Sequence, residues 1–302
     1  MKFSVERLPG NPIIRPNMFG ILGRFSKGRN INGPTLVKVP KWIENPLGQY
    51  YLYFGHHGGK YIRLAYSDAP EGPYTVYRPG TLQNNAKFLQ GRHIASPEIY
   101  FDHKNQKVRM YFHANVRGKG IYEDQGQMTY LAISTDGLNF KPRSEQIAPF
   151  YLRVFKHEGF FYGIAKNDNL DAVLVRSRDG LSKFERGHSF MLHYRHGAFL
   201  KREDTVYVFF TKAFDKPERI LVSEMKLDGD WSRWTLSDPE VLMEPEKGWE
   251  GGNLPLTESK YGGTGAARAL RDPHVFENDA ELYLLYSVKG EKGIAIARLH
   301  EN

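Results

Sequence analysis

The stretch LRDPHVF (residues 270–276), followed after a turn by LYLLY (residues 282–286), is one of five similar units that decide the fold of this chain. Each unit opens with a short apolar run, in most cases carrying a proline, and continues into an aromatic run. This is the pattern of two successive β-strands. The other four units pair INGPTLV (31–37) with YYLYF (50–54), IASPEIY (94–100) with VRMYF (108–112), IAPFYLRV (147–154) with FFYGI (160–164), and RHGAFL (195–200) with VYVFF (206–210).

The repetition predicts a closed ring of blades. A third strand follows the pair and often ends in an Asp-Gly turn, as in residues 132–140 and 175–184, and the units recur at intervals of roughly 50 to 75 residues. We therefore predict an all-β fold, a single domain over residues 1–302 that forms a five-bladed β-propeller of four-stranded antiparallel blades. The last unit has only three strands, so residues 2–8 are expected to supply the fourth and close the ring. A β-sandwich is the alternative, but it gives no reason for five equivalent units.

The composition limits the classes of function. With 42 Lys and Arg against 34 Asp and Glu, the chain carries a formal net charge of +8, and it has no cysteine, which excludes disulfides, Cys–zinc sites and thiol nucleophiles. The basic residues are scattered, so no nucleic-acid partner is expected. No apolar run approaches the roughly 18 residues that span a bilayer, so no membrane partner is expected. The lack of cysteine and of a visible signal peptide favours a cytoplasmic location, with the periplasm or secretion as alternatives if a leader has been removed. Nothing in the sequence indicates an oligomeric state.

The geometry of a propeller selects candidate site residues. The innermost strand of each blade lines the central channel, and the face on which these strands start also carries the loops between second and third strands and the connections between blades. The Asp-Gly turns at Asp136 and Asp179 fall on the opposite face and are interpreted as turn chemistry. Candidates on the first face come from three places. Strand starts supply Asn32, Arg195, His196, Arg271 and Asp272, with Glu98 and Arg153 a little deeper; loops supply His57 and His113; and blade connections supply His93 and Glu250.

Three of these candidates are predicted to be catalytic. Asp272 and Glu98 could meet across the channel as an acid and a base, with His196 as a third proton-transfer group. The other eight candidates are predicted to bind substrate. The Arg and His side chains among them indicate an anionic substrate that carries a carboxylate, as a uronate does, or a sulfate, because Arg binds either anion in a fork geometry. His113 also opens a long loop that runs to Gln127, and loops of this length are often functional.

No metal or cofactor is predicted, because no metal-binding spacing occurs in the sequence. A structural calcium or sodium ion in the central channel is the one alternative to this expectation.

The same residues resemble a known group of enzymes. Proline-containing strand starts, Tyr-Tyr-Leu-Tyr-Phe second strands and Ser-x-Asp-Gly-x-x-Phe hairpins are similar to those of the five-bladed propeller glycoside hydrolases, the families related to 43, 62, 32, 68, 117 and 130. SPEIY (96–100) resembles the second-blade Ala-Pro-Glu/Asp segment of arabinanase-like members, and RDP (271–273) resembles their Arg/Asp-Pro strand starts. The resemblance implies a glycoside hydrolase that acts on an oligosaccharide by carboxylate acid/base catalysis at the central channel.

The chain departs from family 43 at the catalytic positions. Members of that family carry a base Asp at the first-blade start, an Asp in the third blade and an acid Glu in the fourth. The matching positions here read Asn32-Gly33, Ala148 and His196. The family-43 triad is therefore not kept, and other carboxylates are expected to serve if the chain is a hydrolase.

Two other classes of function stay open at this point. A polysaccharide lyase on a propeller would use His or Tyr to take the proton next to a uronate carboxylate, which Arg or Asn would neutralise. A non-catalytic carbohydrate-binding propeller would also be consistent with the missing triad. A lyase would depend on His or Tyr rather than on Asp272 and Glu98, and its unsaturated product would absorb in the ultraviolet.

Overall fold

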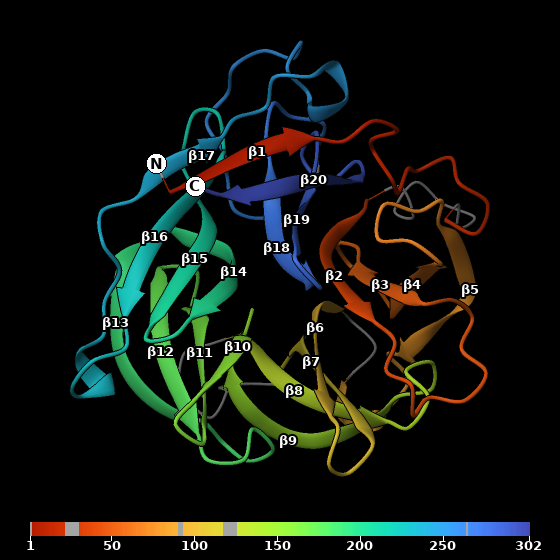
Figure 1. Ribbon diagram of the computed structural model, residues 1–302, viewed down its shortest axis with the longest axis vertical. Helices are drawn as coiled ribbons and strands as arrows, with labels where there is room; N and C mark the ends of the chain where they lie inside the picture. Colours follow the sequence, from red (N-terminus) through yellow and green to blue (C-terminus); the bar gives the residue numbers. More distant parts are fainter. Residues whose placement is uncertain (1, 22–29, 90–92, 117–125, 264) are drawn as a thin grey trace.

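The computed structural model describes residues 2–21, 30–89, 93–116, 126–263 and 265–302. It contains five four-stranded antiparallel sheets, arranged as blades in a ring with the first strand of each blade nearest the centre (Figure 1). The predicted all-β, five-bladed propeller is confirmed. No helix among the described residues is long and apolar enough to cross a membrane.

Each of the first four blades is built from strands in chain order. Blade one comprises β2 (Asn32–Lys38), β3 (Tyr50–Gly55), β4 (Tyr61–Ser67) and β5 (Thr75–Gln83), and blade two comprises β6 (Ile94–Asp102), β7 (Lys107–Asn115), β8 (Gln127–Ser134) and β9 (Lys141–Pro149). Blade three comprises β10 (Arg153–His157), β11 (Phe160–Asn167), β12 (Asp171–Ser177) and β13 (Glu185–Leu192), and blade four comprises β14 (Tyr194–Arg202), β15 (Thr205–Lys212), β16 (Ile220–Lys226) and β17 (Glu240–Met243). Short 3₁₀ turns lie at η2 (Lys87–Leu89), η3 (Trp231–Arg233) and η4 (Gly248–Glu250).

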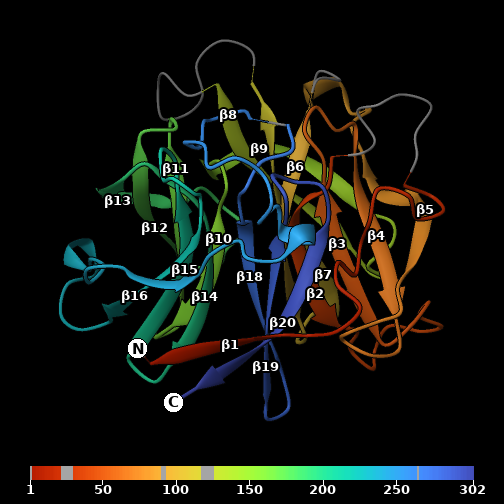
Figure 2. The same cartoon turned by 90° about the horizontal axis from the view of Figure 1, so that it is seen from above.

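Blade five closes the ring with both ends of the chain. It combines β18 (Arg271–Asn278), β19 (Glu281–Ser287) and β20 (Ile294–Glu301) with β1 (Phe3–Arg7) as its outermost strand. β1 pairs antiparallel with β20, with Phe3 opposite Glu301 and Arg7 opposite Ala297, so the two termini lie side by side (Figure 2). The predicted closure by residues 2–8 is confirmed, and it leaves no unpaired edge on β20.

The hydrophobic core lies between the blades. Each of five clusters of buried apolar side chains joins residues of two neighbouring blades; Phe3, for example, packs edge-on against Tyr207 and Phe209 of blade four. Both faces of each middle strand are therefore covered, and every residue of β3 is buried. This explains why the second strands read as continuous aromatic runs rather than as alternating apolar and polar residues.

The inner strands begin with a repeated irregularity. In blades one, two, four and five the pairing with the second strand skips two residues, and the third blade starts with a similar kink. The φ angles of Gly33, Ser96, Tyr151 and Asp272 at these points are 59°, 52°, 57° and 49°. Left-handed backbone is costly for residues other than glycine, and it concentrates at functional sites.

The predicted start of the third inner strand at Ile147 is wrong. Residues 147–149 end β9, the outer strand of blade two, and β10 begins only at Arg153. Ala148 therefore does not occupy the third-blade position that the family-43 comparison gave it. The apolar run from 147 to 155 spans the end of one strand and the start of the next, and periodicity cannot mark the boundary inside such a run.

Candidate active site

A pocket of about 210 Å³ lies where the inner strands start. It is smaller than the roughly 300–1,000 Å³ of drug-sized sites, and its size suits a single sugar ring. The lining is aromatic, basic and amide-bearing, and it comes from the first four blades and the connection from blade four to blade five. The lining residues are His57, Gly58, His93, His113, Asn115, Gln127, Phe150, Tyr151, Lys166, Asn169, Arg195, His196, Tyr261 and Gly262.

Two imidazoles in the pocket wall are each paired with a buried carboxylate. His196 Nε2 lies 3.1 Å from Asp272 Oδ1, and His57 Nδ1 lies 2.7 Å from Glu291 Oε2. The carboxylates stand behind the imidazoles and do not line the pocket; Asp272 is 3% exposed and Glu291 1%. A carboxylate behind an imidazole fixes the orientation of the ring and supports proton transfer by it.

The two carboxylates have opposite electrostatic environments. Burial, together with the negative charge of Glu291, raises the pKa of Asp272, whose Oδ2 accepts one hydrogen bond from Ser287 Oγ at 2.8 Å. Burial also opposes the charge of Glu291, but the hydrogen bond from His57 and the charges of His57 and Arg271 outweigh it and lower the pKa of Glu291. One carboxyl group is thus suited to hold a proton and the other to stay ionised, which is the pattern of paired acid and base groups.

Glu291 has a dense set of donors. Asn30 Nδ2 lies 2.7 Å from Glu291 Oε2, and Asn32 Nδ2 lies 3.0 Å from the same oxygen. Arg271 Nη1 lies 3.1 Å from Oε1. Asn32 and Arg271, predicted from the sequence to bind substrate, are buried behind the pocket wall and hold Glu291 and its surroundings in place.

A line of alternating charges extends from Glu291 under the pocket. Arg271 Nε donates to Glu218 Oε2 at 2.7 Å, and Arg195 Nη1 donates to the same oxygen at 3.1 Å. The two arginines also donate to the main-chain carbonyls of Gly263 and Lys260, at 2.7 Å and 3.1 Å respectively. The connection between blades four and five is thereby fixed over the centre of the ring.

The other two histidines of the pocket wall, His93 and His113, lie next to each other. His93 Nε2 and His113 Nε2 are 3.3 Å apart, and the His93 ring stacks on that of His57, with a centroid separation of 6.3 Å. Burial lowers the pKa of His93 to about 4 and that of His113 and His196 well below the ordinary range. The pKa of His57 is instead raised, mainly by its hydrogen bond to Glu291. The pocket wall therefore favours the neutral form of His93, His113 and His196 and shifts His57 toward its charged form.

The structure places Glu98 and Arg153 below the pocket. They pair with each other, and Arg153 also donates to Thr35 Oγ1 at 2.8 Å and to the carbonyls of Pro97 and Gly197 at 3.0 and 3.2 Å. Glu98 follows the two-residue irregularity of β6 and Arg153 follows the left-handed Tyr151, and neither side chain lines the pocket. The predicted roles of Glu98 in catalysis and of Arg153 in substrate binding stay predictions that this position does not favour.

Glu250 lies at the ring closure instead of in the pocket. Its Oε1 accepts from Arg7 Nε at 2.8 Å and from Tyr286 Oη at 3.0 Å, and its Oε2 accepts from the backbone N–H groups of Glu246 and Lys247, each at 2.9 Å. With these four donors its side chain joins β1 and β19 of blade five to the connection from blade four. This arrangement indicates a structural rather than a substrate-binding carboxylate.

Sequence reasoning missed several residues of the site. Lys166 and Tyr261 line the pocket, and Glu218 and Glu291 lie behind it. Glu291 belongs to the charged turn between β19 and β20, where the local sequence resembles any exposed turn. The only visible signal for Lys166 is a cation at the end of an apolar strand. Of the predicted loop from His113 to Gln127, residues 117–125 lie outside the described residues.

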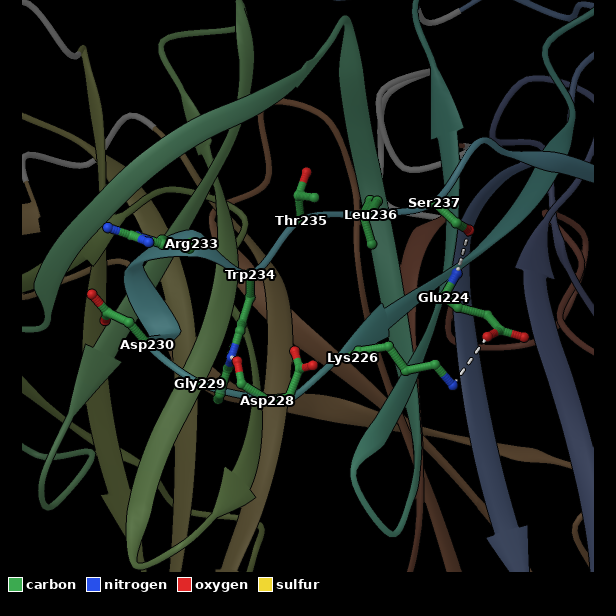
Figure 3. A pocket seen from close by; sticks show the side chains of 10 residues that line it. All are labelled: Glu224, Lys226, Asp228, Gly229, Asp230, Arg233, Trp234, Thr235, Leu236 and Ser237. Atoms are coloured by element: carbon green, nitrogen blue, oxygen red, sulfur yellow. Dashed lines mark hydrogen bonds and ion pairs between the residues drawn. The ribbon is translucent and has the colours of Figure 1, made fainter.

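A larger, open hollow of about 630 Å³ lies elsewhere, at the outer part of blade four (Figure 3). All of its lining belongs to one segment, residues 224–237, in which Lys226 pairs with Glu224 at 3.4 Å and Trp234 Nε1 donates to the Asp228 carbonyl at 2.9 Å. Side chains from different blades do not converge there. The smaller pocket at the centre of the ring is therefore the better candidate site.

Among the described residues, no group of three or more His, Asp or Glu side chains is arranged to hold a metal ion. The predicted absence of a cofactor stays a prediction.

The fold is that of the five-bladed propeller glycoside hydrolases. A glycosyl hydrolase from Bacteroides ovatus superimposes with a TM-score of 0.68 at 11% identity, covering 99% of this chain and 94% of that one. A thermostable family-43 glycoside hydrolase superimposes with a TM-score of 0.60 at 14% identity, with 90% of each chain covered. A family-43 enzyme from Xanthomonas citri complexed with xylose gives 0.59 at 11% identity, with 90% of this chain and 86% of that one covered. At these identities the likeness is one of fold, and at that level the predicted resemblance is confirmed.

The sequence itself is related to a viral protein. No family model matches the chain. The uncharacterized protein R118 of Acanthamoeba polyphaga mimivirus is 36% identical over 330 residues, covering 98% of this chain and 90% of that protein. The chain belongs to the same family as R118.

Proposed function

We propose that this protein is a glycoside hydrolase that acts on an oligosaccharide carrying an anionic group, a uronate carboxylate or a sulfate. The observation that carries the proposal is the pair of carboxylate-backed imidazoles, His196 with Asp272 and His57 with Glu291, in one sugar-sized pocket. The fold shared with solved glycoside hydrolases, one of them complexed with xylose, supports a carbohydrate substrate.

Glycoside hydrolysis needs a proton for the leaving oxygen and a carboxylate on the other side of the sugar. The raised pKa of Asp272 suits it, together with His196, to hold and deliver that proton. The lowered pKa of Glu291 suits it to remain charged behind His57. Glu291 is a better candidate than Glu98 for the second carboxylate, because it is hydrogen-bonded to His57, which lines the pocket, whereas Glu98 pairs with Arg153.

A screen of defined oligosaccharides tests the proposal. Uronate-containing, sulfated and neutral oligosaccharides are incubated with the protein, and new reducing ends are measured together with ultraviolet absorbance. If a uronate-containing or sulfated substrate gives new reducing ends without a rise in ultraviolet absorbance, the result would support hydrolysis. Cleavage of neutral substrates alone would contradict the anionic part of the proposal. No cleavage of any member would favour the non-catalytic carbohydrate-binding alternative.

A polysaccharide lyase is the second candidate, and one observation favours it. The groups that line the pocket are imidazoles, tyrosines and cations, while the carboxylates are buried behind them. Tyr151 lies against both His113 and His196, with ring centroids 4.6 and 4.9 Å away. A His or Tyr base beside a cation is the arrangement that proton removal next to a uronate carboxylate requires. Such a reaction would yield a product that absorbs in the ultraviolet.

A further inference from the structure

Lys166 occupies an unusual position in the pocket. It stands near the end of β11, is 2% exposed and lines the pocket wall. Its Nζ donates one hydrogen bond, to Asn169 Oδ1 at 2.6 Å. Three aromatic rings surround it, with Nζ 5.3 Å from the ring centre of Phe150, 5.4 Å from that of Tyr151 and 4.7 Å from that of Tyr261.

No carboxylate of the described part of the chain forms an ion pair with Lys166, whereas Arg195 and Arg271 at the same site pair with Glu218. The charged groups that influence Lys166 are Arg195, Glu218 and Asp272. Burial, with the like charge of Arg195, lowers the pKa of Lys166 to about 7. A buried cation without a carboxylate is costly to maintain, and a negatively charged ligand would remove that cost.

Arg195 adds a second donor at the same place. Its guanidinium carbon lies 5.9 Å from the ring centre of Tyr261, the ring that Lys166 also faces. One nitrogen, Nη1, is engaged by Glu218 and the Lys260 carbonyl, while its buried Nε has no hydrogen-bond partner among the described residues. The ammonium group has two further donors beyond the one used by Asn169.

We propose that Lys166 and Arg195 form an anion subsite in the pocket that binds the carboxylate or sulfate group of the substrate. This inference rests on the proposed function and names the part of the site that selects the substrate. The ring of Tyr261 supplies a flat surface for the sugar that carries the anion. Carboxylates and sulfates share the negative oxygens that Lys and Arg bind, so both are candidates for the group.

Titration calorimetry with three monosaccharide probes tests the subsite. D-glucuronate carries the carboxylate, D-glucose 6-sulfate carries the sulfate, and D-glucose is the neutral control. We expect at least one charged probe to bind roughly tenfold or more tightly than glucose, since a hydrogen bond to a charged group is worth that much. Whichever charged probe binds more tightly identifies the anion. Equal affinity for all three probes, or a preference for glucose, would overturn the proposal.

Lys166→Met is the specific variant, and Lys107→Met, an exposed lysine at the start of β7, is the matched control. We expect Lys166→Met to lower the affinity for the charged probe roughly 10- to 100-fold. Its affinity for glucose should stay within about threefold of the wild-type value. The control should bind both probes like the wild type. An unchanged affinity of folded Lys166→Met for the charged probe would overturn the proposal.

The wild-type protein gives a readout that does not depend on the variant folding. An anion beside Lys166 should raise its pKa, so binding near pH 7 should take up protons, measured as a buffer-dependent enthalpy. No proton uptake by the wild type would count against the subsite. Charged-probe binding without any cleavage of oligosaccharides would leave the subsite standing and the proposed hydrolase wrong. Cleavage that is the same in Lys166→Met would leave the hydrolase standing and the subsite wrong.

Discussion

Two buried carboxylates of this propeller, Glu250 at the ring closure and Asp272 at the central pocket, are similarly hidden from solvent but differ in their partners. Glu250 accepts hydrogen bonds from a guanidinium, a phenol and two backbone N–H groups. Asp272 accepts a hydrogen bond from Ser287 and pairs with the imidazole of His196. It also experiences the negative charge of Glu291. The first carboxylate thus has four hydrogen-bond donors, whereas burial and the charge of Glu291 raise the pKa of the second. Burial alone therefore does not separate a structural carboxylate from a chemical one; the donors around it do.

The largest effect is expected from Asp272→Asn. The amide keeps the shape and can still hydrogen-bond Ser287, but it cannot deliver a proton. We expect the rate per folded molecule to fall by about 10²–10⁴-fold, with little change in the thermal midpoint. Steady-state kinetics and thermal denaturation on one preparation measure both quantities. A rate within threefold of the wild type, combined with a lower midpoint, would make Asp272 a structural residue like Glu250.

The matched change, Glu250→Gln, should have the opposite outcome. The substitution leaves Arg7 without its buried charged partner and weakens the attachment of β1 at the ring closure. Breaking a buried ion pair in this way typically costs about 3–5 kcal/mol of unfolding free energy. Denaturant unfolding measures the loss, and kinetics at a temperature where the variant is folded should show a nearly normal rate. A large drop in rate without loss of stability would remove the contrast between the two carboxylates.

Glu98→Gln tests whether a third carboxylate, which pairs with Arg153, is structural or catalytic. Arg153 would lose its charged partner but keep its hydrogen bonds to Thr35 and to backbone carbonyls. We expect a loss of roughly 1–3 kcal/mol in unfolding free energy and a turnover rate within about threefold of the wild type. A rate loss of a hundredfold or more would restore Glu98 as a catalytic carboxylate.

The stability of the protein should also depend on pH through Asp272. Its pKa in the folded state is raised above the ordinary value of 3.8, so the folded protein keeps a proton that the unfolded chain releases. The stabilisation from this proton is present at low pH and is lost as the pH rises through the folded pKa. The wild type should therefore lose unfolding free energy relative to Asp272→Asn as the pH rises above about 4, by up to about 1.4 kcal/mol per pH unit. Denaturant titrations at a series of pH values measure it, and a flat difference would contradict the raised pKa.

The fold was predictable because the packing of a propeller repeats. Each blade buries both faces of its middle strand, which produces aromatic runs such as residues 50–54, and the three-strand final unit indicated the closure by β1. The boundary at Ile147 was not predictable, because an apolar run across two adjacent strands carries no mark of where the first one ends.

The site was predictable only where it follows from strand order. Asp272, His196 and Arg195 were found because inner strands start on one face. Glu98 and Arg153 were expected a little deeper than the other candidates, and their catalytic and binding roles stay predictions. The two-residue irregularity before Glu98 sets that residue back from the strand start. Lys166 reaches the site from the end of β11 and Glu291 from the turn between β19 and β20. Their roles depend on contacts across the ring that no local pattern records.

The source of the oxygen in the product shows most directly whether the pocket hydrolyses a glycosidic bond. Once the screen has found a cleaved oligosaccharide, the reaction is run in water enriched in oxygen-18. The masses of the products are then measured by mass spectrometry. The account predicts one oxygen-18 atom at the newly formed reducing end, in an amount that Asp272→Asn reduces in proportion to its rate. Cleavage without oxygen-18, giving an unsaturated sugar, would contradict hydrolysis and establish the lyase instead.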